Sequence, residues 1–208
     1  MKLLDKLKKE LKVNKKGITF LIGIAIIGFI FGSIFITIIN DSDKTLVKNY
    51  ILSYISNIKS DNIDYIDNFK DIFLSNFSFI IIVWLLGMSV IGIPINIFYY
   101  FITSFTLGFS ISSFILTYKI KGILFSIIYV IPHSLINIFI YTYLIYYTIN
   151  FSLILIYSIL KKKSINFKNI INKYIKILIC STLIILFTSI YEAFLIPTIF
   201  SKLLFILR

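Results

Sequence analysis

Four long stretches of this chain carry almost no charge. Residues 17–39, 72–118, 122–160 and 177–201 contain no Asp, Glu, Lys or Arg apart from Glu192. Each stretch is long enough to cross about 30 Å of hydrocarbon, which takes roughly 20 helical residues. The composition agrees, because 59% of the residues are hydrophobic and only 14% are charged, against about 25% charged in soluble domains. The sequence therefore predicts an integral membrane protein.

Helices account for these stretches better than the strands of a barrel. Each stretch is continuously apolar, whereas the strands of a membrane barrel alternate between apolar and polar residues. We therefore predict an all-α, polytopic helical membrane protein in which residues 1–208 form one domain. Residues 17–39 lack a convincing small-residue cleavage site before Asn40. We interpret them as a retained first helix rather than a signal peptide.

The charged segments predict the orientation of the chain. Residues 1–16 hold seven lysines and two acids, with leucines at helical spacing, which is typical of a basic amphipathic helix on an anionic cytoplasmic surface. A second lysine cluster covers residues 161–176. Both clusters should lie in the cytoplasm. Residues 40–71 hold six aspartates and four lysines, and we expect this acidic segment outside.

The segment 40–71 is predicted to be helical, with a helix from about Asp43 and a second one leading into the membrane. One interpretation is a solvated connector. The alternative is a docking surface for an outer partner, because this is the only sizeable aqueous loop in the predicted topology. The candidate docking residues are Asp41, Asp43, Tyr50, Tyr54, Asp61 and Asp64.

Residues 72–208 form the predicted bundle core, and its path has two solutions. Either 72–118 is a hairpin with a tight connection at "GIPIN", or 122–160 is the hairpin. Pro132 favours the first solution, because proline disfavours helix at the residue before it and suits the first turn of a following helix. Residues 122–130 are then a re-entrant half-helix, and the total is about five transmembrane helices.

The predicted break at Pro132 lies beside the only histidine, in "YVIPHSLIN". A broken helix leaves backbone groups that cost several kcal/mol each in hydrocarbon unless they are satisfied. Ser134 can cap the following helix, and Asn137 can reach back across the break. Structural satisfaction by His133, Ser134 and Asn137 is our main interpretation. A proton or ion relay through His133 is the alternative.

Glu192 is the one charged residue inside the four stretches. A carboxylate in that position should pair with a cation, lie near an interface or be protonated. In the favoured topology Lys119 and Lys121 lie on the outer side, as does this part of the last helix. We therefore predict that Glu192 pairs with Lys119 or Lys121.

Small residues recur at a spacing of four or so in two of the predicted spans. Small side chains let helix backbones approach closely in a membrane. We interpret them as packing positions within the bundle, with a seam between copies in a homo-oligomer as the alternative. The candidate packing residues are Gly28, Gly32 and Gly108.

The sequence offers no catalytic constellation. One His, one Cys and a single Glu in the spans provide no zinc site, no Ser-His-Asp set and no phosphate-binding loop. The lone Cys180 lies in the last apolar stretch and is interpreted as a small hydrophobic residue. We therefore predict no enzymatic activity, no cofactor, no metal and no nucleic-acid partner, with membrane lipids as the surroundings.

The order of several short strings resembles the family of stage II sporulation protein M. The strings are "FGSIF", "NDSDK", "WLLGMSVIGIPI", "FTLGFSIS" and "KGILFSIIYVIPHSLI", and together they extend over nearly the whole chain. The family has no assigned catalytic residue to carry over to "PHSLI" at residues 132–136.

The resemblance implies a place in sporulation. Members of the family act during engulfment, in the mother-cell membrane at the sporulation septum, where they hold sporulation proteins D and P, which degrade peptidoglycan. We therefore expect a non-enzymatic membrane scaffold that recruits and localises peptidoglycan hydrolases. A transporter or channel subunit that uses the helix break near Pro132 is the alternative, because transporters build binding sites from discontinuous helices.

Overall fold

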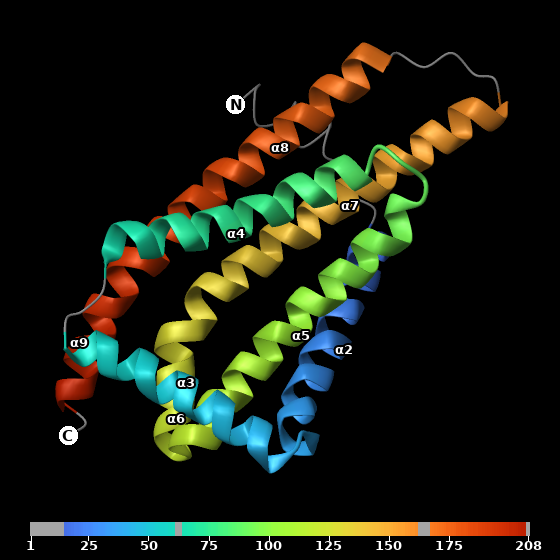
Figure 1. The fold of residues 1–208 in the computed structure, drawn as a ribbon. Coiled ribbons are helices and arrows are strands. Elements are labelled where there is room, and N and C mark those ends of the chain that lie inside the picture. The colour runs from blue at the N-terminus through green and yellow to red at the C-terminus, as the bar shows by residue number, and fades with distance from the viewer. Residues whose placement is uncertain (1–14, 61–63, 162–166, 207–208) are drawn as a thin grey trace.

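A computed structural model of the chain describes residues 15–60, 64–161 and 167–206. Every regular element in these residues is helical, and the helices form one elongated bundle (Figure 1). The elements are α2 (Lys15–Ile38), α3 (Asp41–Lys59), α4 (Tyr65–Leu86), α5 (Gly92–Tyr118), α6 (Ile120–Phe125), the π-helical turn η1 (Ser126–Val130), α7 (Ile131–Lys161), α8 (Phe167–Ile190), the π-helical turn η2 (Tyr191–Leu195) and α9 (Ile196–Ile206).

Five helical segments of the described chain are long and apolar enough to cross a membrane, as predicted. Two of them, α4 and α5, come from the stretch 72–118 and are joined by the short turn of residues 87–91. The favoured hairpin is therefore correct. The other three spans are Lys15–Ile38, Ile120–Ser158 and Phe167–Phe200.

The two ends of the bundle differ in the helix ends and the lysine residues that lie there. One end of the bundle holds the start of α2, the turn between α4 and α5, the end of α7 and the start of α8. The other end holds α3, α6 and α9 (Figure 1). The first end therefore gathers the described parts of both lysine clusters, including Lys15, Lys16 and Lys168. By the positive-inside rule the lysine-rich first end is the expected cytoplasmic end. It is called the inner end below, and the end that holds α3 is called the outer end. Most of the predicted N-terminal amphipathic helix lies outside the described residues.

The predicted re-entrant half-helix is wrong. The chain is continuously helical from Ile120 to Lys161, and a π-helical turn, Ser126–Val130, precedes Pro132 where a break was expected. Proline lacks an N–H group, and its ring collides with the carbonyl four residues earlier in a regular α-helix. A π turn is wider and relieves this collision without ending the helix. Residues 120–130 are thus the outer part of one long span.

Helices α2 and α5 pack closely along glycines. A Cβ atom added to Gly28 would lie 2.7 Å from the carbonyl oxygen of Phe101. A Cβ added to Gly32 would overlap the backbone of Phe105, and one added to Gly108 would overlap the backbone of α2. All three candidate packing glycines thus lie in one contact inside the chain, where backbone meets backbone.

Helices α4 and α5 are held together at the inner end of the bundle. The amide of Asn96, which is 1% exposed, donates to the carbonyl of Val83 at 3.1 Å. The hydroxyl of Ser152 on α7 donates to the carbonyl of Gly87 in the turn. Farther out the two helices diverge (Figure 1). The hairpin is therefore closed at the inner end and open toward α3.

Helix α3 lies across the outer end of the bundle. It begins at Asp41, two residues before the predicted start, with Asn40 at the cap. Its buried face contributes Ile51, Ile55 and Ile58 to a cluster that also contains Phe125 of α6 and Phe200 of α9. The helix is amphipathic, and its apolar face is fixed on α5, α6 and α9.

Candidate functional site

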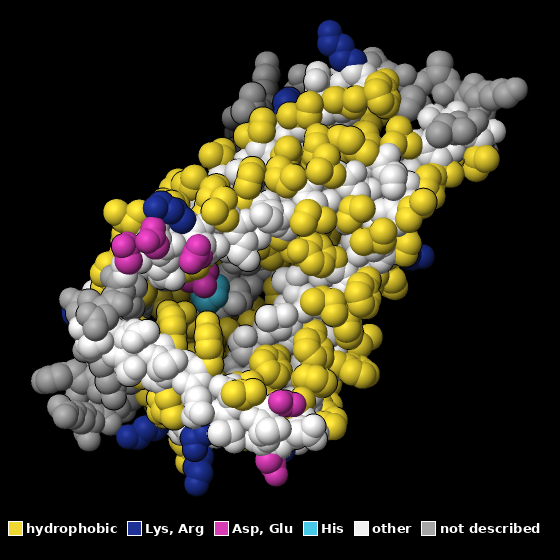
Figure 2. All heavy atoms as spheres, viewed as in Figure 1, with side chains coloured by type: hydrophobic (Ala, Val, Ile, Leu, Met, Phe, Trp, Pro, Cys, Tyr) yellow, Lys and Arg dark blue, Asp and Glu magenta, His cyan; other side chains and the backbone are white. Residues whose placement is uncertain are grey.

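A cavity of about 1160 Å³ lies between the diverging halves of α4 and α5. Its other walls come from α3, η1, the first turns of α7, and Glu192 of η2. Figure 2 shows the hollow on the flank of the molecule, with the histidine at its floor beside acidic side chains. The hollow is open on the side of the bundle, between α4 and α5, and its outer rim is formed by α3.

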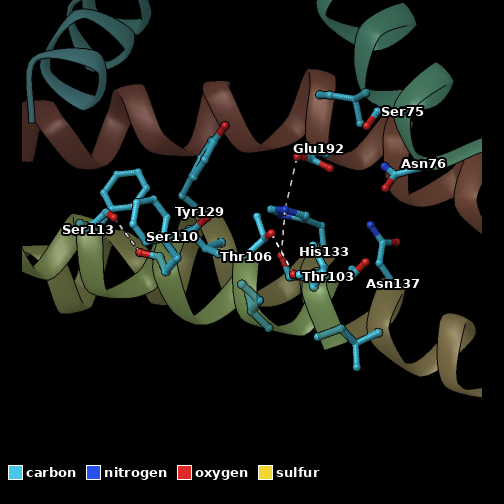
Figure 3. A pocket seen from close by; sticks show the side chains of 18 of the residues that line it. Ser75, Asn76, Thr103, Thr106, Ser110, Ser113, Tyr129, His133, Asn137 and Glu192 are labelled. Carbon is cyan, nitrogen blue, oxygen red and sulfur yellow. Dashed lines mark hydrogen bonds and ion pairs between the residues drawn. The ribbon is translucent and has the colours of Figure 1, made fainter. Parts of the chain in front are cut away.

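His133 and Glu192 contact each other at the floor of this cavity. The Nε2 atom of His133 lies 3.3 Å from Oε1 of Glu192 and 3.1 Å from Oγ of Ser134. Both side chains are largely buried, at 11% and 15% exposure. In Figure 3, Glu192 points from its helix toward the histidine ring. The pair is ionic when the imidazole is protonated and otherwise shares a hydrogen bond.

The second imidazole nitrogen has no side-chain partner, although the backbone of Tyr129, one turn earlier, interacts with the ring. The Nδ1 atom of His133 is buried and has no hydrogen-bond partner within the described residues. An unpaired polar atom in a low-dielectric interior costs about 1–3 kcal/mol. The site therefore holds hydrogen-bonding capacity that its own side chains do not satisfy.

Two π-helical turns bring the pair together. Glu192 is the second residue of η2, and His133 follows η1 by three residues. Each π turn ends one residue before an Ile-Pro pair, at Pro132 and at Pro197. Because η1 precedes α7, η2 follows α8 and these two helices run antiparallel, both turns lie toward the outer end of the bundle. π turns change the direction in which the following side chains point and are frequent at functional sites.

The other predicted polar residues near Pro132 have different partners from those expected. Ser134 lies inside a continuous helix and contacts His133 instead of capping a new helix. The side-chain oxygen of Asn137 accepts a hydrogen bond from Thr188 of α8 at 2.8 Å, so Asn137 links two spans instead of bridging a break. Both differences follow from the unbroken helix.

The predicted pairing of Glu192 with a lysine is wrong. Among the described residues, the ion-pair partner of Glu192 is His133. Lys121 precedes His133 by 12 residues in one helical segment, which corresponds to about 18 Å at 1.5 Å per residue. Lys119 lies in the turn before α6, where it has a positive φ of 54°. Both lysines therefore belong to the outer end of the bundle.

A row of hydroxyl groups on α5 faces the cavity, and the sequence analysis missed it as a group (Figure 3). Thr103, Thr106, Ser110 and Ser113 all line the hollow. Three of these hydroxyls donate to carbonyls four residues earlier, so their oxygens act as acceptors toward the cavity. Their spacing of three and four residues is the signal that could have identified one polar face.

Aromatic side chains close the cavity at its inner end. The ring of Phe79 on α4 lies 4.7 Å from the ring of Tyr99 and 4.0 Å from that of Tyr141. The hydroxyl of Tyr141 donates to Asn76 at 2.7 Å, which fixes this cluster. Below it Tyr100, which is fully buried, contacts Thr142. The cavity thus extends from α3 to the middle of the bundle.

The predicted docking residues separate into two groups. Asp41, Asp43 and Tyr50 are exposed on α3, and Tyr50 is 74% exposed. Tyr54 instead faces the bundle, where its hydroxyl accepts a hydrogen bond from Tyr129 at 2.6 Å; burial raises the pKa of Tyr54. Asp64 accepts from the backbone N–H groups of residues 66 and 67 and caps α4. Asp61 lies outside the described residues.

The described residues give no support for a metal site. Within residues 15–60, 64–161 and 167–206, no three His, Cys, Asp or Glu side chains are grouped as a metal ion would require. Cys180 is exposed on the surface of α8. The ionisable groups available to the cavity are thus the His133–Glu192 pair, Asp71 and several tyrosines.

Five long apolar helices around an off-centre cavity with a polar floor define a multi-pass helical membrane protein. The sequence model of the family described as stage II sporulation protein M matches residues 18–197. The chain therefore belongs to the stage II sporulation protein M family, as the order of its short strings predicted. No curated protein and no solved structure matches the chain significantly.

Proposed function

We propose that this protein is a non-enzymatic membrane scaffold of engulfment. In this role it recruits and localises the peptidoglycan hydrolases called sporulation proteins D and P, at the septum and in the mother-cell membrane. Family membership supports a role in sporulation. The scaffold role, its partners and its place at the septum are our proposal.

The outer platform formed by α3 is the observation that carries the proposal. A docking surface must be held in a fixed position, and α3 is fixed through the burial of Ile51, Ile55 and Ile58. Burying such a side chain contributes about 1.5–3 kcal/mol. Beside this buried face, at the rim of the cavity, Tyr50 is 74% exposed, with Asp43 two helical turns earlier on the same side. Exposed tyrosines on a rigid element are frequent anchors of protein interfaces.

The alternative of a channel has weaker support. A channel needs a continuous polar path across the bilayer. In the described residues the cavity ends at the cluster of Phe79, Tyr99 and Tyr141, and a separate hollow of about 220 Å³ near Tyr174 lies toward the cytoplasmic end. These rings favour a site that is open from the outer half over a pore.

Copurification tests the proposed recruitment. Sporulation proteins D and P are produced together with the tagged full chain, the membranes are dissolved in mild detergent, and the hydrolases retained on the tag are measured by mass spectrometry. The variant Asp43→Lys with Tyr50→Ala should retain about 30-fold less of at least one hydrolase, because loss of an anchoring aromatic side chain costs about 2 kcal/mol.

A matched control is the variant Phe20→Ala. Phe20 is also an exposed aromatic residue, at 58%, but it lies on α2 near the cytoplasmic end. This variant should retain the hydrolases as the unchanged chain does. Equal retention by the α3 variant and the unchanged chain would refute recruitment through α3.

A further inference from the structure

We propose that the cavity between α4 and α5 binds the headgroup of a neutral, sugar-bearing membrane lipid. The acyl chains of this lipid stay in the bilayer and leave the cavity sideways between the two helices. This inference goes beyond the scaffold role and does not depend on hydrolase recruitment. It rests on the size, the opening, the charge and the hydrogen-bonding character of the cavity.

The size and position of the cavity suit part of a lipid. Its volume of about 1160 Å³ exceeds the roughly 300–1,000 Å³ of pockets for drug-sized ligands. It follows α5 from Tyr99 to Phe114, or about 22 Å at 1.5 Å per residue. One leaflet contributes about half of the 30 Å of hydrocarbon. The cavity is thus longer than one leaflet is thick, so a lipid of the outer leaflet would lie beside most of its open side.

Polar side chains at the floor of the cavity need a hydrogen-bond partner, which lipid tails cannot supply. The whole His133 residue is 9% exposed, and no side chain of the described residues meets its Nδ1 atom. Intramembrane ionisable groups are tolerated where they face a polar cavity or one another. A headgroup with hydroxyls can both donate to this nitrogen and accept from its proton, whichever tautomer is present.

The charge of the lining argues against a phosphate headgroup. The charged lining residues within the described chain are the acids Asp71 and Glu192, and neither lysine nor arginine is among the lining residues. Sites for phosphate are typically built from arginine, lysine or helix N-termini. An anionic phospholipid would therefore meet acidic side chains without a compensating lysine or arginine.

The lining offers both acceptors and donors, the donors including the side-chain amides of Asn76 and Asn137, which suits a ligand that carries hydroxyls. The hydroxyls of Thr103, Thr106 and Ser113 donate their protons to helix carbonyls, so in this arrangement their oxygens accept from a ligand. The carboxylate of Glu192 is a further acceptor. Aromatic rings such as those of Tyr129 and Phe109 line the same space. Acceptors together with aromatic faces match the hydroxyls and the apolar faces of a sugar.

Competition between three lipids tests the proposal. The purified full chain in detergent micelles is mixed with equimolar monoglucosyl-diacylglycerol, diacylglycerol and phosphatidylglycerol that carry identical acyl chains, and native mass spectrometry counts the lipids bound. We expect the glucolipid to be bound about tenfold more than either competitor. Equal binding of diacylglycerol would show that the chains alone are recognised, and stronger binding of phosphatidylglycerol would contradict the charge argument; either result overturns the proposal, as does the absence of any bound lipid.

Variants locate the binding. Ser110→Trp should fill the cavity and abolish glucolipid binding, whereas Phe98→Trp adds the same side chain on the outer face of α5, where Phe98 is 65% exposed, and should leave it unchanged. Thr106→Val, which removes one acceptor, should weaken binding about fivefold. Thermal unfolding in the same micelles identifies any variant that fails to fold. Unchanged binding in folded Ser110→Trp or Thr106→Val protein would refute the site.

Discussion

Replacing Gly32 with leucine is expected to separate α2 from α5 and to destabilise the bundle by more than about 3 kcal/mol. Inserting extra methylenes into a packed core typically costs about 1–3 kcal/mol when side chains can shift. Here the first added carbon would overlap the backbone of Phe105, and backbone cannot rotate away. Unfolding of the purified protein in mixed micelles, followed by circular dichroism, measures the change.

The same chain offers a matched control for this substitution. Gly23 lies on the same helix, and a Cβ atom added there meets nothing within 4 Å. Gly23→Leu should leave the unfolding midpoint unchanged or raise it slightly, because leucine has a better helix propensity than glycine. If both variants unfold alike, the close contact between α2 and α5 is not what stabilises the bundle.

Removing either member of the His133–Glu192 pair is expected to cost about 1–3 kcal/mol, because the remaining buried polar group loses its hydrogen-bond partner. Removing both should cost clearly less than the sum of the two single changes. The variants His133→Ala, Glu192→Ala and the double variant form a double-mutant cycle. We expect a coupling free energy of about 1–3 kcal/mol, measured by unfolding in micelles.

An exposed ion pair supplies the comparison. Lys70 and Asp67 lie 2.8 Å apart with side chains 60% and 67% exposed, so their distance is even shorter than that of the buried pair. Exposed pairs are worth about 0–1 kcal/mol. The same cycle on Asp67 and Lys70 should give the smaller coupling. A coupling near zero for His133 and Glu192 would mean that the two groups do not stabilise each other.

The spans could be predicted because hydrocarbon imposes strong rules. Charge-free stretches long enough to cross the bilayer identified all five, and the proline and glycine near "GIPIN" placed the α4–α5 hairpin correctly. The overlaps at Gly32 and Gly108 also follow a pattern that is visible in the sequence, since small residues recur where backbones meet. These features depend on local composition.

The site could not be assembled from the sequence. His133 and Glu192 are 59 residues apart, and their contact depends on the rotation of α7 against α8. The two π turns contribute to that rotation, and their only sign in the sequence is the Ile-Pro pair that follows each of them. A proline in an apolar stretch suggested a helix break, whereas the wide turn before Pro132 kept the helix intact. The cavity arises from the divergence of α4 and α5, which no single segment encodes.

Labelling from each side of the membrane tests the central claim, that α3 lies outside and the lysine-rich end lies in the cytoplasm. In a Cys180→Ser background, single cysteines replace the exposed residues Ser53 on α3 and Lys168 at the start of α8. A membrane-impermeant maleimide should label Ser53→Cys in intact cells and Lys168→Cys only after permeabilisation. Labelling of Lys168→Cys in intact cells, with Ser53→Cys protected, would contradict the account.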